Sequence, residues 1–242
     1  MTGPGDTTAQ RPADTAQRPD ATAQRPADTT AAKIAQLRLS TALLGDVLDL
    51  LGFRHQFLPP QVRPLDPALT VVGRAMPVLI TRVFGPQPRP FGRLTEALDQ
   101  LRPGEVYLAR GGGAPCAAWG EILSVTARRR GAAGAVIDGY HRDTRQIRSL
   151  GWPVFSRGGY AQDAGVRASV IDFRVPAEFG RVRVEPGDLV VGDVDGVVAI
   201  PRACEAEVIE RAARKAAVEH EVRSAIENGM PSTEAFARYG VL

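Results

Sequence analysis

Apolar residues follow two different spacings along the chain, and the alternation between them predicts the order of strands and helices. Short apolar runs typical of buried strands lie at 70–74, 76–81, 105–109, 133–137 and 152–155. Further strand-like runs and tight turns fill residues 166–200. Helical spacing and capping residues predict helices over 41–51, 91–101, 117–130, 143–150 and 203–228, with a short one starting near Ser232. This order predicts a single α/β domain with layered sheets.

The first 32 residues follow neither spacing. The unit Thr-Ala-Gln-Arg-Pro recurs at 8–12, 15–19 and 22–26, without the apolar stripe that a coiled coil requires. A segment rich in Pro, Thr, Asp and Ala cannot bury a core, so residues 1–32 are expected to form a disordered tail. The folded domain is then expected to span residues 33–242, including the C-terminal helices.

The charge balance argues against several classes of function. The chain has 30 basic and 27 acidic residues that are mixed throughout, and its one basic cluster, 128–130, ends a predicted helix, where cations are favoured. Few aromatic residues accompany that cluster, so we do not expect nucleic acid binding. No apolar run is long enough to span a membrane, and the N-terminus lacks a signal pattern, so a soluble cytoplasmic protein is expected.

Cysteine and histidine are too few for a disulfide framework or a zinc centre. Cys116 and Cys204 are expected to be small buried residues rather than partners in a disulfide or ligands of a metal. The chain has three histidines, at positions 55, 141 and 220, which do not form a zinc-binding pattern.

The most informative segment is Asp-Gly-Tyr-His-Arg-Asp at 138–143, directly after the apolar run that ends at Ile137. Strand ends are where α/β proteins keep their ligand sites. Asp143 could hold Mg²⁺ or Mn²⁺ with water completing the shell, and Arg142 could bind the carboxylate or carbonyl of a keto acid. The alternatives for this pair are a surface salt bridge or a helix cap, and His141 is expected to form part of the pocket wall.

A glycine-rich loop and a turn-rich segment offer weaker signals. The loop at 111–113, followed by Gly120-Glu121, could expose backbone amides to a carboxylate or enolate oxygen, or it could be an ordinary tight turn. It matches neither the P-loop nor the dinucleotide-binding motif. Glu121 could equally be a favourable first-turn charge. The acidic residues of 184–201 are expected to cap turns between two strands.

Taken in order, four segments resemble those of one family. They are Gly-Gly-Gly with Ala-Ala-Trp-Gly-Glu (111–121), Gly-Ala-Val-Ile-Asp-Gly-x-x-Arg-Asp (134–143), Trp-Pro-Val-Phe (152–155) and Pro-Gly-Asp-Leu-Val-Val-Gly-Asp-x-Asp-Gly-Val-Val-x-Ile-Pro (186–201). Over residues 35–242 the chain resembles the 4-hydroxy-4-methyl-2-oxoglutarate / 4-carboxy-4-hydroxy-2-oxoadipate aldolases, whose fold family includes the regulators of ribonuclease activity. The resemblance implies a layered αββα sandwich of the swivelling β/β/α type and a homotrimer or homohexamer with active sites between subunits.

The resemblance also implies a set of site residues. Asp143 would bind a divalent metal, Mg²⁺ or Mn²⁺, directly, and Arg142 would bind substrate beside it. Glu121 would hold metal-bound water and act as a catalytic residue together with Arg142 and Asp143. The substrate-binding set would also include the start of the predicted helix, at Gly120, Glu121, Ile122 and Leu123.

One further carboxylate would come from a neighbouring subunit. In the family a glutamate of the C-terminal helix completes the water shell of the metal. Glu219 matches it best, and Glu221 is the next candidate. The chain departs from the family pattern at Tyr140 and His141, which replace small and aliphatic residues and could narrow the pocket or change the substrate. The N-terminal tail has no family counterpart.

The implied activity is a metal-dependent, class II aldolase that cleaves a 4-hydroxy-2-oxo acid to pyruvate and a second carbonyl compound, with oxaloacetate decarboxylation as a side activity. Schiff-base chemistry is not expected, because neither Lys33 nor Lys215 lies at a strand end. Two alternatives stay open. One is a non-catalytic regulator that binds a ribonuclease or another protein, and the other is a lyase or hydratase adapted to a biosynthetic pathway.

Overall fold

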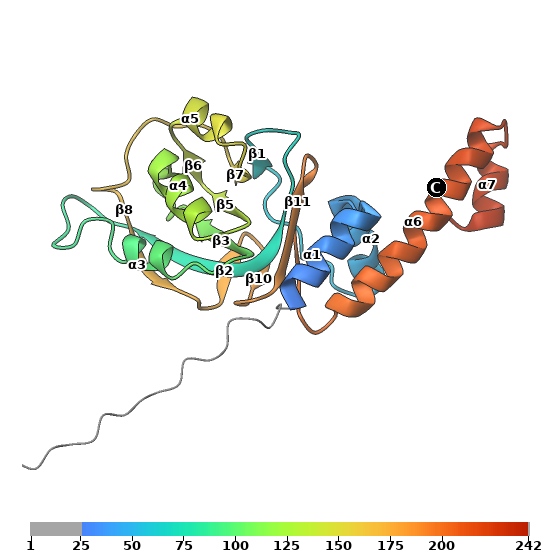
Figure 1. Cartoon of the computed structure of the whole chain (residues 1–242), viewed down its shortest axis with the longest axis horizontal. Helices are drawn as coiled ribbons and strands as arrows, with labels where there is room; N and C mark the ends of the chain where they lie inside the picture. Colours follow the sequence, from blue (N-terminus) through green and yellow to red (C-terminus); the bar gives the residue numbers. More distant parts are fainter. Residues whose placement is uncertain (1–25, 242) are drawn as a thin grey trace, which may run out of the picture.

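The computed structural model describes residues 26–241, which fold around a strongly curved eight-stranded sheet (Figure 1). The strand order is β1-β7-β5-β3-β2-β11-β12, and β8 also pairs with β2. The strands are β1 (Arg63–Pro64), β2 (Val71–Arg82), β3 (Glu105–Arg110), β5 (Gly134–Asp138), β7 (Val154–Ser156), β8 (Ala168–Phe173), β11 (Leu189–Asp193) and β12 (Gly196–Ile200). Two small ladders, β4 (Ala117–Trp119) with β6 (Tyr140–His141) and β9 (Ala177–Phe179) with β10 (Val182–Val184), complete the β-structure.

The centre of the sheet is parallel. Strands β2, β3, β5 and β7 run in one direction, whereas β1, β8 and β11 each pair antiparallel with a neighbour. Because parallel strands end at the same edge, the segments after β3 and β5 are brought together there. This edge carries the residues that the sequence singled out.

The helices lie in two groups at opposite ends of the molecule. They are α1 (Pro26–Leu37), α2 (Thr41–Leu50), α3 (Leu94–Asp99), α4 (Glu121–Arg129), α5 (Thr144–Ser149), α6 (Glu205–Glu227) and α7 (Ser232–Tyr239). Helices α3, α4 and α5 pack beside one another next to the parallel strands, while α1, α2 and the first half of α6 lie by β11 and β12. The rest of α6 and α7 extend away from the sheet as an arm, defined here as residues 217–241 (Figure 1).

Three apolar clusters show that the helices and strands form four layers. One cluster joins α3, α4 and α5 to one side of β2, β3 and β5, and a second fills the interior of the curved sheet. The third joins β11 and β12 to α1, α2 and α6. Side chains alternate between clusters along a strand, so Val190 faces the interior while Leu189 and Val191 face the helices. The predicted αββα layering is confirmed.

The structure corrects several predicted boundaries. Helix α1 begins at Pro26, inside the predicted tail, because Ile34 is buried against the third cluster and anchors it; the prediction for residues 1–25 lies outside the described residues. The helix predicted from residue 117 begins at Glu121, because 117–119 pair with β6 as a short strand. The predicted strands 70–74 and 76–81 are one continuous strand, β2.

Other predictions are confirmed. Cys116 and Cys204 are both free and buried. The basic cluster 128–130 is exposed at the end of α4. Acidic residues of 184–201 cap turns: Asp188 accepts a hydrogen bond from the Glu185 amide at 2.8 Å, and Asp193 accepts one from the Asp195 amide at 2.9 Å.

Across residues 26–241, no helix has the length and hydrophobicity required to cross a membrane.

Candidate functional site

The site is built where β5 ends. Asp138 closes that strand, and Gly139 lies against Gly111 at the end of β3, so closely that a Cβ on Gly139 would lie 2.9 Å from the Gly111 Cα. The close approach explains both glycines, since a side chain at either position would push the two strand ends apart. The chain then passes through β6 and presents Arg142 and Asp143 at the edge of the sheet.

Asp143 adopts a left-handed backbone conformation, with φ of 61°, directly before helix α5. Its carboxylate makes no cap bond to α5, so the structure does not support the helix-cap alternative. The Oδ2 atom instead accepts a hydrogen bond from the backbone amide of Glu121, at 3.1 Å. The left-handed turn therefore directs the Asp143 side chain to the first residue of α4.

Gly120 permits this contact. A Cβ at that position would lie 2.8 Å from the Asp143 Oδ2 atom, which is closer than real Cβ contacts. As the N-cap of α4, Gly120 also has no side chain to satisfy the first helical amides. The amides of Ile122 and Leu123 have no acceptor within the helix, so they can bind an external anion.

Arg142 lies between two carboxylates. Its Nε atom is 3.9 Å from Asp143 Oδ2, and its Nη1 atom is 2.9 Å from Asp163 Oδ1. The side chains of all three residues are between 39% and 43% exposed, so the group is open to solvent. Asp163 was not predicted, because it lies twenty residues further along the chain in a loop without apolar periodicity.

The His141 side chain lies between two hydroxyl groups. It is buried, and its two ring nitrogens lie 2.7 Å from the Ser156 hydroxyl and 2.8 Å from the Thr144 hydroxyl. Burial lowers the pKa of His141, although nearby Asp143 acts in the opposite direction. The buried ring, with both nitrogens within hydrogen-bond distance of a hydroxyl, supports the turn around Asp143. Its expected place in a pocket wall stays a prediction. Tyr140 packs against Tyr160, with ring centres 5.6 Å apart.

The glycine loop at 111–113 has a packing role at its first two positions. A Cβ on Gly112 would lie 3.1 Å from Ile80, and φ is 69° there, so both space and conformation favour glycine. Strand β4 separates this loop from α4. The amides left free at the start of α4 therefore belong to a different segment from this loop.

Hard divalent cations fit the donor chemistry of Asp143. Mg²⁺ is commonly bound through one or two carboxylates and keeps several waters. Asp143 offers one partly exposed carboxylate, which is already oriented by the backbone amide of Glu121, and Glu121 itself is half-buried. Within residues 26–241 no group of three or more His, Cys, Asp or Glu side chains could hold a metal ion. One copy of the chain would therefore have to rely on water or on a second copy for further ligands.

Glu219 lies on α6, and Figure 1 shows α6 on the other side of the curved sheet from α5, the helix that directly follows Asp143. Its carboxylate is 3.3 Å from the Nζ atom of Lys215, which also pairs with Asp46. Burial alone would lower the pKa of Lys215, but the hydrogen bonds to Asp46 and Glu219 outweigh it and raise that pKa. A lysine held in its charged form is a poor Schiff-base nucleophile.

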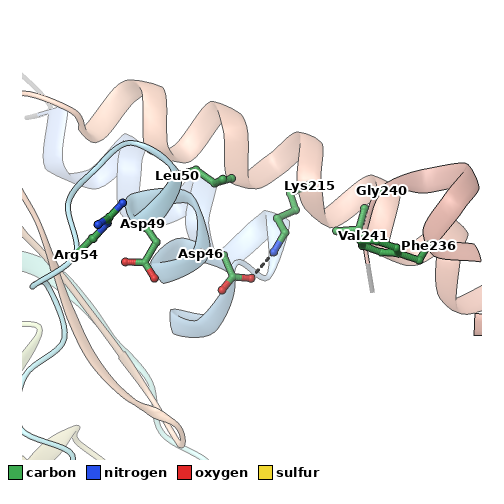
Figure 2. Close-up of a pocket in the computed structure, with 8 residues that line it drawn as sticks. All are labelled: Asp46, Asp49, Leu50, Arg54, Lys215, Phe236, Gly240 and Val241. Carbon is green, nitrogen blue, oxygen red and sulfur yellow. Dashed lines mark hydrogen bonds and ion pairs between the residues drawn. The ribbon is translucent and has the colours of Figure 1, made fainter. Parts of the chain in front are cut away.

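A recess of about 700 Å³ lies between α2 and the arm (Figure 2). Figure 2 shows Asp46 and Lys215 pointing toward each other across it, with Phe236 and Val241 on the arm side. The recess is distant from Arg142 and Asp143, and its charged groups are already paired in part. We therefore place the candidate chemistry at the strand end and not in this recess.

The fold and the site together define a class: a layered αββα protein with an Arg-Asp pair facing the start of a helix. A family model described as RraA-like, Aldolase/RraA, matches residues 41–199. The chain therefore belongs to the RraA-like Aldolase/RraA family, as the sequence motifs predicted. The matched range includes Gly120, Arg142, Asp143 and Asp163 but not α6 with Glu219.

Individual relatives agree with this assignment. The chain is 31% identical over 205 residues to a Halalkalibacterium halodurans protein named "putative 4-hydroxy-4-methyl-2-oxoglutarate aldolase", covering 84% of this chain and 92% of that one. An uncharacterized Pseudomonas syringae protein of known structure has a TM-score of 0.75 at 31% identity, over 86% of this chain and 97% of that one. Streptomyces coelicolor RraAS2, described as an unusual member of the RNase ES inhibitor RraA protein family, has a TM-score of 0.74 at 29% identity, over 83% and 99%.

Proposed function

We propose that this chain is a divalent-metal-dependent carbon–carbon lyase that cleaves a 4-hydroxy-2-oxo acid to pyruvate and a second carbonyl compound. The observation that carries the proposal is the contact of the Asp143 carboxylate with the Glu121 amide, with Arg142 adjacent. This places a carboxylate, a guanidinium and free helix amides within one small region. These are the groups that a 2-oxo acid and a hard cation need together.

Each group has a distinct role in the proposed reaction. Asp143 would be the direct protein ligand of Mg²⁺ or Mn²⁺, which when bound supplies a Lewis acid for negative charge on the keto oxygen. Arg142 would bind the carboxylate end of the substrate, together with the amides of Ile122 and Leu123. Gly120 leaves the approach to those amides open.

Proton movement completes the reaction. The C3–C4 bond breaks, its electron pair stays on C3 as the enolate of pyruvate, and the 4-hydroxyl loses its proton to become a carbonyl. Glu121, acting through water, would accept that proton and return one to C3. Oxaloacetate would follow the same course with carbon dioxide as the second product, since it also yields the enolate of pyruvate.

A neighbouring copy would complete the site. In this proposal the chain forms a homotrimer or homohexamer, and Glu219 of the adjacent copy, or else Glu221, holds water on the cation. Two observations support an intermolecular role for this part of α6. Residues 26–241 of one copy hold no group of three or more candidate ligands, and the arm reaches beyond its own sheet (Figure 1).

The test is pyruvate release from oxaloacetate and from 4-hydroxy-4-methyl-2-oxoglutarate by the purified chain. Release is expected with Mg²⁺ or Mn²⁺, with loss of activity in EDTA and recovery when the metal is restored. Absence of turnover with both substrates and both metals would contradict the proposal.

The second candidate is a regulator that binds a ribonuclease or another protein. It is favoured by exposed apolar side chains at the junction of α2 and the arm, where Leu50 is 75% and Phe236 is 54% exposed. The likeness to the Streptomyces RraAS2 structure supports it as well. An inert chain that inhibits a purified ribonuclease would favour this candidate over the lyase.

A further inference from the structure

We propose that Asp163 is a positioning residue that fixes the Arg142 guanidinium for binding of the anionic 2-oxo acid. The inference deepens the proposed function, because it concerns the same site. It adds a residue that neither the sequence motifs nor the family resemblance provides.

Asp163 is itself held rigidly. Its Oδ2 atom accepts a hydrogen bond of 2.7 Å from the Gly165 amide, while its Oδ1 atom lies 2.9 Å from Arg142 Nη1. One oxygen is therefore tied to the backbone and the other to the guanidinium. The loop around it is anchored by a bond from Arg167 Nη1 to the Asp163 carbonyl, at 3.1 Å, and by a bridge between Asp163 and Ala117.

Arg142 needs such an anchor. Its backbone amide is bonded to the Trp119 carbonyl at 3.0 Å, which fixes the start of the side chain but not the guanidinium. Asp143 Oδ2, at 3.9 Å from Nε, is at the limit of an ion pair and already accepts the Glu121 amide. Asp163 thus makes the shortest ion-pair contact of the guanidinium, and it leaves the remaining N–H groups free for an anion.

Two opposing effects of Asp163 can be separated by experiment. A fixed guanidinium binds an anion better, because less side-chain freedom is lost on binding. A carboxylate near the site also repels an anionic ligand. If positioning dominates, loss of the Asp163 contact weakens anion binding; if repulsion dominates, the same loss strengthens it.

Gly165 provides a second way to move Asp163 without changing charge. A Cβ at Gly165 would lie 2.7 Å from Asp163 Oδ2, and the side-chain carboxylate is the group that can give way. Gly165→Ala should displace the carboxylate, whereas Asp163→Asn removes its charge. The matched control is Asp172→Asn, since Asp172 is 45% exposed, pairs with Arg93 at 2.8 Å and also accepts a backbone amide.

The experiment measures oxalate binding by calorimetry in Mg²⁺ and the order parameter of the Arg142 Nε–H bond by NMR, in the full-length chain. Both Asp163→Asn and Gly165→Ala should raise the dissociation constant of oxalate about tenfold and lower the order parameter, while Asp172→Asn should leave both unchanged. Unchanged or tighter oxalate binding in the two variants would overturn the inference. If the wild type binds no oxalate, the proposed function fails. In that case, an Arg142 order parameter that is unchanged in both variants would also refute the role of Asp163. A lowered order parameter would support Asp163 as the anchor of Arg142, without a role in binding the 2-oxo acid.

Discussion

Asp143 combines an unusual backbone conformation with the side-chain chemistry of the site. Left-handed φ values are uncommon for residues with a side chain, and Asp and Asn tolerate them best after glycine. Such residues gather at functional sites, where the surrounding structure holds them in place. Here the holding groups are His141 and Thr144 on one side and the start of α4 on the other.

Gly120 offers the sharpest residue-scale prediction. In Gly120→Ala the new methyl group would lie 2.8 Å from Asp143 Oδ2, so the carboxylate must leave the Glu121 amide. We expect kcat/KM for the 2-oxo acid to fall about 10- to 100-fold, a loss typical of misplacing one catalytic group. Steady-state assays of pyruvate release measure the change.

The control for this variant is Gly159→Ala. Gly159 lies near the same segment, but its added Cβ would make only an ordinary 3.4 Å contact with the Thr144 hydroxyl. It should retain wild-type activity. Equal activity of the two alanine variants would contradict the role assigned to Gly120.

Helix α4 is the element that positions the site, and a buried hydroxyl fixes its first turn. The Ser124 hydroxyl accepts a hydrogen bond from the Trp119 indole at 2.8 Å and donates one to the Gly120 carbonyl at 3.0 Å. Trp119 stacks in turn on Trp152, with ring centres 6.4 Å apart. The start of the helix is thus tied to the apolar core.

Ser124→Ala tests this connection. The variant leaves the buried Trp119 N–H without a partner, so the free energy of unfolding should fall by about 1–3 kcal/mol. Thr126→Ala on the same helix is the control, because its hydroxyl bonds the Ile122 carbonyl near the surface and its loss should cost less than about 0.5 kcal/mol. Urea unfolding measures both; equal losses would argue against a special role for the Ser124 hydroxyl.

At the scale of elements, the sequence predicted whether a segment forms a helix or a strand better than it predicted where that segment begins and ends. Apolar periodicity placed α2, β3, β5 and α6 because each buries a regular face. It assigned 117–119 to a helix, because a three-residue strand paired with β6 has no period of its own. For the same reason it could not reveal Asp163, whose contact with Arg142 depends on how a loop folds back over the sheet edge.

At the scale of the whole molecule, Glu205 joins one helical layer to the sheet. It lies on α6, pairs with Arg74 of β2 through both carboxylate oxygens and accepts the Thr30 hydroxyl of α1 at 3.1 Å. Burial acts to raise the pKa of Glu205, but the bonds from Arg74 and Thr30 outweigh it, and the net shift is downward. The ionised form is therefore stabilised by folding.

Glu205→Gln should lower the free energy of unfolding by about 2 kcal/mol at pH 7, because Arg74 loses its charged partner. Since the folded pKa lies below the unfolded one, this contribution is complete above about pH 4.5 and is lost as the pH falls through the folded pKa. Glu207→Gln, which removes an exposed pair with Arg211, should cost less than about 0.5 kcal/mol. Urea unfolding at pH 7 and below about pH 4.5 measures the free energy of unfolding of both variants. Equal losses in Glu205→Gln and Glu207→Gln at pH 7 would contradict the role assigned to Glu205.

The arm should govern assembly in the proposed oligomer. Phe236→Ser removes an exposed aromatic side chain beside the recess of Figure 2 and should raise the subunit dissociation constant at least about tenfold. Phe84→Ser is the control, since Phe84 is 81% exposed on the body of the molecule. Light scattering across a dilution series measures the mass; an unchanged profile for Phe236→Ser would exclude the arm from the interface.

The layered architecture and the Arg142-Asp143 pair were predictable from local sequence. Alternating strand and helix patterns indicate the layers, and the pair directly follows the apolar strand β5 and the short strand β6. Residues that other segments contribute to the site were not predictable from the periodicity of apolar residues. Asp163 comes from a distant loop, and the proposed Glu219 lies on α6, which packs with α2 and α7 rather than with the helices beside the site. Contacts between segments that are distant in sequence form only in the folded molecule.

The most direct measurement compares pyruvate release by the wild type and by Asp143→Asn in saturating Mg²⁺, with assembly state and circular dichroism recorded for both. Asparagine tolerates the left-handed conformation and can still accept the Glu121 amide, so only the charge is lost. The wild type should release pyruvate in a metal-dependent manner, and the variant should lose at least about a thousandfold in kcat/KM with its fold intact. A folded variant that remains active, or a wild type that needs no metal, would contradict a cation held by Asp143.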